Sequence, residues 1–177
     1  MRWLLVAIIA YVLLLIETAV FLPGGLAVEV DAHPAQPDLL LALGMFLAFF
    51  FPPREVFIAG WFLGLASDLV GIAGRLGLKA LLFCLGLYLV SHLRGNLPRQ
   101  RAIVQFVAAL AIVFAVHLAG HLATAALGGA WPPVLRSAEI SFLDALYTAV
   151  LAPYLVWMLL LLRSPLGLSA SALSQRD

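Results

Sequence analysis

Asp68 is the ionisable residue whose position most favours a chemical role. It comes near the end of an apolar run, residues 55–70, that is predicted to form a membrane helix. An acid inside such a span can carry protons or bind a ligand. An acid at the carboxyl end of a helix also opposes the helix dipole and needs a cation or a donor nearby, for which Arg75 and Lys79 are the nearest candidates. We favour a structural role, in which Asp68 fixes the glycine-rich turn that follows, and keep proton relay and substrate binding as alternatives.

Two histidines form the other pattern with chemical potential. His117 and His121 stand four residues apart in the apolar run 102–127, so a helix places both on one face. Such a pair can bind a metal, but no third ligand lies close in the sequence, since Cys84 is the only cysteine and belongs to another run. Hydrogen bonding between helices is the favoured role, and no metal site is predicted.

The remaining polar residues of the apolar runs do not form a catalytic pattern. Glu17 is expected to reach the membrane interface, and Gln105 and Asp144 fall near the starts of their spans, where Asp144 suits the first helical turn. No nucleophile–base pair, phosphate-binding loop, zinc motif or haem motif occurs in the sequence. We therefore predict no catalytic residue, no cofactor and no enzymatic activity. An enzyme acting on lipid would have to depend on Asp68 or His117.

Composition sets the class of protein. The chain has 177 residues, of which 64% are hydrophobic and 11% are charged, whereas soluble domains are about half apolar and about a quarter charged. This difference indicates an integral membrane protein. The formal net charge of +1 says little about partners, but the lack of a basic cluster argues against a nucleic-acid partner.

Six apolar runs predict an all-α fold, a bundle of six transmembrane helices. They form a single domain, residues 1–163, followed by a short cytoplasmic tail, residues 164–177. The first run is interpreted as a retained span and not as a cleaved signal peptide, because it contains Glu17 and no small-residue cleavage site follows it. Pro153 should kink the last span. The predicted spans are residues 3–21, 38–51, 55–70, 78–93, 102–127 and 141–162.

The second span is short. It lies between a helix-start signal, Pro37-Asp38, and Pro52-Pro53. Its core covers about 20 Å, against a hydrocarbon layer of ~30 Å. Three explanations stay open, namely a smaller tilt than that of its neighbours, a locally thinned bilayer, or shielding by the rest of the protein.

The arginines and lysines predict the orientation. With six spans, one side of the membrane carries seven of these residues and the other carries three, so the positive-inside rule places both termini in the cytoplasm. Arg94, Arg99 and Arg101 lie in one short loop on the richer side. They are candidates for contact with anionic lipid or a cytoplasmic partner, although an orientation signal alone also explains them. The outer loop, residues 22–37, carries no motif that can be assigned.

Small residues predict how the third span packs. Gly60, Gly64 and Asp68 recur every four residues, with Ser67 and Gly71 beside them, and this spacing lets another helix backbone come close in lipid. The opposite face is bulky and suits lipid. The predicted packing and structural residues are Gly60, Gly64, Asp68, Gly71, Arg75 and Gly77.

Local motifs resemble a known family. They are PDLLL at 37–41, GLASD at 64–68, GRLGLKAL at 74–81 and YLVSHLR at 88–94. With six spans and a basic loop after the fourth, the chain resembles the rod shape-determining protein family MreD. The resemblance is dense over residues 37–105 and only compositional over the first and last spans.

The resemblance implies a function and a set of partners. Proteins of this kind are non-enzymatic scaffolds of the cell-elongation machinery, which builds peptidoglycan in the bacterial inner membrane. The implied partners are MreC, the actin-like MreB, RodA, a class B penicillin-binding protein and membrane lipid.

The family is also similar in fold to the substrate-binding subunits of energy-coupling-factor transporters. The alanines of the first span, Ala7, Ala10 and Ala19, lack the Ala-xxx-Ala spacing by which those subunits dock. This difference counts against an uptake role, which stays the alternative.

Overall fold

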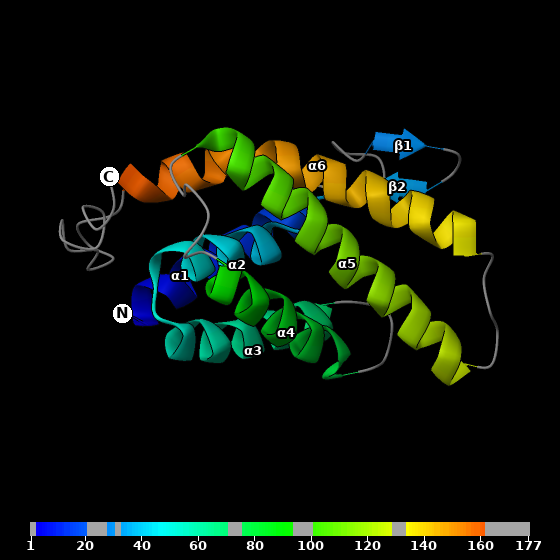
Figure 1. Ribbon diagram of the computed structural model, residues 1–177, viewed down its shortest axis with the longest axis horizontal. Helices are drawn as coiled ribbons and strands as arrows, with labels where there is room; N and C mark the ends of the chain where they lie inside the picture. Colours follow the sequence, from blue (N-terminus) through cyan, green and yellow to red (C-terminus); the bar gives the residue numbers. More distant parts are fainter. Residues whose placement is uncertain are drawn as a thin grey trace.

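The computed structural model describes residues 3–20, 28–30, 33–70, 76–93, 101–128 and 134–161. These residues form a helical bundle with a short hairpin at one end (Figure 1). In chain order the elements are α1 (Trp3–Val20), β1 (Val28–Val30), β2 (His33–Ala35), α2 (Leu39–Phe50), α3 (Pro53–Val70), α4 (Leu78–Leu93), α5 (Ala102–Gly128) and α6 (Val134–Leu161).

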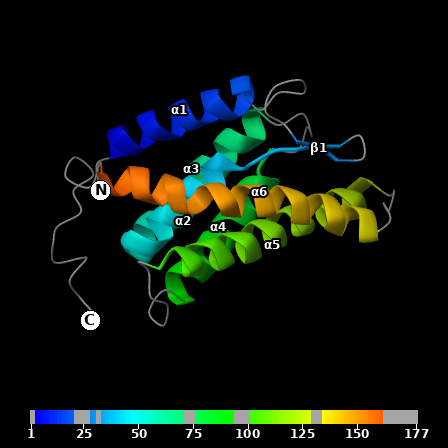
Figure 2. The same cartoon turned by 90° about the horizontal axis from the view of Figure 1, so that it is seen from above.

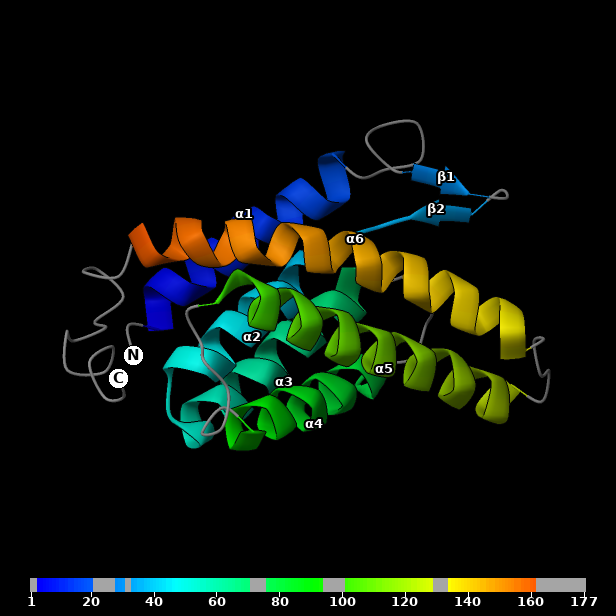
Figure 3. The ribbon, with the colours of Figure 1, turned by 45° about the horizontal axis from the view of Figure 1, so that its top comes forward.

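The centre of the bundle is α2. Every residue from Leu39 to Phe49 is buried, and α2 contacts each of the other five helices (Figure 3). A helix that is apolar all round is stable where neighbours cover all of its faces. Of the three explanations for the short second span, the structure supports shielding by the rest of the protein.

Two helical hairpins account for most of the remaining packing. The most extensive contacts join α3 to α4 and α5 to α6. Pro53 begins α3, and a proline is tolerated in a first turn because its missing N–H has no partner within the helix. Figure 2 shows α1 along one edge of the bundle and α5 along the opposite edge.

The all-α class is confirmed by the six helices, but two details of the outer segments differ from the prediction. The prediction omitted a short hairpin, in which antiparallel pairing places Val28 opposite Ala35. The last helix begins at Val134, ahead of residue 141, where the predicted span begins. Arg136 and Glu139 interrupt the apolar run, but both residues are good helix formers. The helix continues through Pro153.

The surface of the bundle is largely apolar. Large hydrophobic side chains are exposed on each of the five helices around α2, for example Leu4, Phe62, Leu85, Ile103 and Leu135. A surface of this kind calls for lipid or protein around it. By length and composition, two of the described helices can cross a membrane, within Ala102–Leu127 and Val134–Leu161. The segments Trp3–Ala19, Leu39–Phe50 and Leu78–Leu93 are apolar but shorter.

Candidate functional site

The small face of α3 lies against α4, inside the bundle. A Cβ atom added at Gly64 would come within 2.8 Å of the backbone nitrogen of Ala80, and one at Gly60 would lie 3.3 Å from the Cα of Cys84. The two helix backbones are therefore in direct contact along this face. A partner helix cannot use the same face without separating α3 from α4.

Asp68 caps the amino end of α4. Its carboxylate accepts hydrogen bonds from the backbone nitrogens of Gly77 at 2.8 Å, Lys79 at 3.3 Å and Ala80 at 3.3 Å. Gly77 has a φ of +99°, a conformation that glycine adopts without strain. The carboxylate thus satisfies N–H groups that have no partner within α4.

Lys79 and Ser67 are in contact beside this turn. The ammonium group of Lys79 donates to the hydroxyl of Ser67 at 3.1 Å. Gly71 and Arg75 lie outside the described residues, and so does any pairing of Arg75 with Asp68.

This capping gives a first expected result. Asp68→Ala removes the acceptor for three backbone N–H groups and should destabilise the protein by about 0.5–2 kcal/mol. Asp68→Asn keeps an oxygen acceptor at the same place and should cost less. The check is the unfolding midpoint in detergent. If Asn were as harmful as Ala, the charge of Asp68, and not its hydrogen bonds, would be what matters.

A second polar cluster lies where α2 begins. Asp38 is 4% exposed, and its carboxylate accepts the backbone N–H of Leu41 at 2.8 Å, so it caps α2. The backbone nitrogen of Asp38 donates to the hydroxyl of Thr148 at 2.9 Å. That hydroxyl donates to the backbone carbonyl of Asp144 at 2.8 Å. The start of α2 is therefore joined to α6.

His117 connects the same cluster to α5. Its Nε2 lies 3.2 Å from Oδ2 of Asp38, and its Nδ1 lies 3.4 Å from Oδ2 of Asp144. Asp144 also accepts the backbone N–H of Gln36 at 3.0 Å. The expected role of His117 in hydrogen bonding between helices is confirmed. The expected place of Asp144 in a first helical turn was wrong, because α6 begins ten residues earlier.

Glu17 also turns toward this cluster. Its Oε2 accepts the backbone N–H of Leu39 at 3.3 Å, so the side chain meets the start of α2, and its position at the membrane interface stays a prediction. Within the described residues, no group of three His, Cys, Asp or Glu side chains is arranged to hold a metal ion.

The sequence identified Asp38 as part of a helix-start signal, which its capping of α2 confirms, but it did not reveal the contacts of Asp38 with Thr148 and His117. An acid directly before an apolar helix could have indicated a buried polar contact at that helix start. Other spans also carry isolated acids and histidines, so this signal alone did not single out Asp38.

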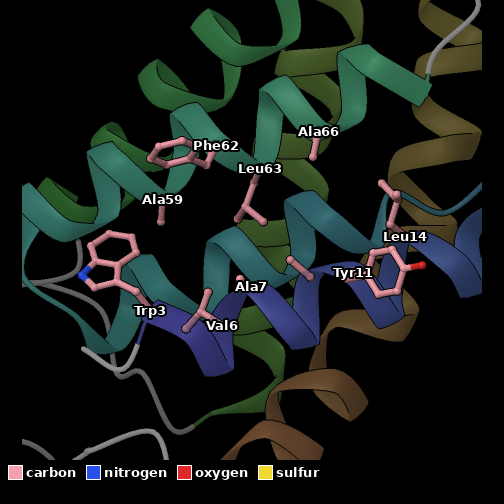
Figure 4. Close-up of a pocket in the computed structure, with 10 residues that line it drawn as sticks. Trp3, Val6, Ala7, Tyr11, Leu14, Ala59, Phe62, Leu63 and Ala66 are labelled. Atoms are coloured by element: carbon pink, nitrogen blue, oxygen red, sulfur yellow. The ribbon is translucent and has the colours of Figure 1, made fainter.

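An apolar groove runs between α1 and α3. Its volume is about 420 Å³. In Figure 4, Leu63 on α3 points toward α1. The lining residues are Trp3, Val6, Ala7, Ala10, Tyr11, Leu14, Ala59, Phe62, Leu63 and Ala66. Such a surface can accept lipid chains or apolar side chains, but it offers no chemistry.

The basic residues proposed for lipid or partner contact are only partly described. Arg101 is exposed immediately before α5. Arg94 and Arg99 lie outside the described residues.

Comparison with known protein families identifies the family to which the chain is similar. Residues 1–164 match the model of a family described as the rod shape-determining protein MreD. Among curated proteins, no match to the chain is found.

Proposed function

The chain belongs to the MreD family, and we propose that it acts as a non-enzymatic scaffold of the peptidoglycan-elongation complex. Members of the family are membrane proteins with a role in rod-shape determination. The observation that carries the proposal is the extent of the match, which includes all six helices and not one local motif.

The proposed partners are MreC first, and with it RodA, a class B penicillin-binding protein and MreB. Their contacts are proposed for the outer faces of the bundle and for the polar loops. This choice is supported by the packing of Gly60 and Gly64 against α4, which uses the small face of α3 internally. The groove between α1 and α3 and the exposed Arg101 are the candidates among the described residues.

The proposed location is the bacterial inner membrane, with six spans and both termini in the cytoplasm. The distribution of Lys and Arg supports this orientation. The burial of α2 is compatible with six spans even though that helix is short. Its neighbours surround it in place of lipid, so it need not match the thickness of the hydrocarbon layer.

The uptake alternative requires a ligand pocket lined by the first, fourth, fifth and sixth spans. In the structure, α2 fills the centre of the bundle and contacts α1, α4, α5 and α6. This packing favours the scaffold.

A depletion experiment tests the proposal. Removing the chain from its native bacterium should turn elongated cells into rounded ones, and the wild-type chain supplied from a plasmid should restore their length. An empty vector is the control. Cells that keep their shape and their rate of elongation after complete depletion would contradict the proposed function.

A further inference from the structure

We propose that His117 is held as a doubly protonated imidazolium between Asp38 and Asp144, and that it forms a proton-dependent clamp joining the start of α2 to α5 and α6. The geometry is a carboxylate on each side of one ring. Nε2 lies 3.2 Å from Asp38 and Nδ1 lies 3.4 Å from Asp144. All three side chains are mostly buried, with exposed fractions of 18% for His117, 5% for Asp38 and 14% for Asp144.

Hydrogen-bonding rules require a proton on each contact. A neutral imidazole has one N–H donor and one nitrogen lone pair, and an ionised carboxylate only accepts. In a neutral His117 between two ionised carboxylates, the ring nitrogen without a proton would therefore face a carboxylate oxygen, and their lone pairs would repel each other. An additional proton removes this repulsion and makes both contacts charge-assisted.

The additional proton belongs on the ring and not on a carboxyl group. Asp has a reference pKa of about 3.9 and His of about 6.5, so an imidazole binds the proton more tightly than a carboxylate does. Both carboxylates also accept backbone N–H groups, from Leu41 and from Gln36. Asp38 further lies at the amino end of α2, where the helix dipole stabilises negative charge.

Two more titratable groups face this end of the bundle among the described residues. Glu17 of α1 bonds to the backbone N–H of Leu39, next to Asp38. Lys79 of α4 bonds to Ser67. The neighbourhood therefore contains the carboxylates of Asp38 and Asp144, the carboxyl group of Glu17, the ammonium group of Lys79 and the ring of His117.

The clamp controls how the outer segment is held. Gln36 and Asp38 lead from β2 into α2, and both donate backbone hydrogen bonds to α6, at Asp144 and Thr148. β2 itself contacts α6. Loss of the proton from His117 at alkaline pH, or protonation of Asp38 at acid pH, should loosen α2 and the hairpin from α6.

The test is nitrogen NMR of histidine side chains in the full-length protein, labelled with ¹⁵N-histidine and purified in detergent without a histidine tag. The chain has four histidines. A variant with His33→Gln, His92→Gln and His121→Gln leaves His117 as the sole histidine, so no clamp residue is changed. At neutral pH we expect two protonated ring nitrogens. A neutral tautomer at neutral pH would overturn the proposal.

A stability profile gives an independent readout. The wild-type unfolding temperature should fall on both the acid and the alkaline side of a maximum. His117→Gln should flatten the alkaline fall, since glutamine does not titrate, and His121→Gln on the same helix should keep the wild-type profile. An alkaline fall of equal size in His117→Gln and in the wild type would overturn the clamp. Should His117→Gln not fold, the NMR result decides alone.

Discussion

Replacing Gly64 with alanine is expected to destabilise the bundle strongly. The added Cβ would lie within 2.8 Å of the backbone nitrogen of Ala80, and the obstacle is helix backbone, which cannot rotate away as a side chain can. Overpacking typically costs about 1–3 kcal/mol, and the contact with backbone places this change at the upper end. Since folded proteins are stable by only about 5–15 kcal/mol, this loss is a large share of the total stability and should lower the unfolding temperature clearly.

Other glycines supply matched controls. At Gly60 the added atom would lie 3.3 Å from the Cα of Cys84, and at Gly120 it would lie 3.7 Å from a side-chain atom of Leu82. The destabilisation should therefore decrease from Gly64→Ala to Gly60→Ala to Gly120→Ala. Size-exclusion profiles and unfolding temperatures in one detergent measure the series. Equal behaviour of Gly64→Ala and Gly120→Ala would show that α3 and α4 are not in backbone contact.

Replacing Asp38 with alanine is the second change with a large expected effect. It removes the cap of α2, which is worth about 0.5–2 kcal/mol. It also deprives His117 of one of its two carboxylates, and breaking a buried ion pair from one side costs about 3–5 kcal/mol. The two losses share one side chain and do not add fully. We expect a total of about 3 kcal/mol or more, measured by unfolding in detergent.

Ser91→Ala is the control for this change. Ser91 is also buried, but its hydroxyl donates to the carbonyl of Tyr88 in its own helix at 2.7 Å. Its loss should cost no more than about 1 kcal/mol. If Asp38→Ala were no more harmful than Ser91→Ala, the cluster at the start of α2 would not stabilise the bundle.

Local patterns allowed much of the fold to be predicted. The glycine spacing of α3 identified the face that meets α4, because close helix packing depends on small side chains at fixed intervals. The positions of α4 and α5 followed from long apolar runs bounded by turn residues and charges.

The polar cluster could not be predicted in the same way. Asp38 and His117 are 79 residues apart, and nothing in the local sequence around either one specifies the other. The short run of α2 did not reveal that its neighbours would cover it on every side. Strands of three residues are too short to show a periodic pattern, and the start of α6 was hidden by two charged residues that interrupt its apolar run.

The most direct test of the scaffold is a tagged purification from native membranes in mild detergent, with the co-purifying proteins identified by mass spectrometry. The scaffold proposal predicts recovery of a single-span MreC-like protein together with elongation enzymes, and their loss when the tag is carried by an unrelated membrane protein of similar size. Recovery of paired ATPases with a coupling membrane subunit would contradict it and would identify the chain as an uptake component.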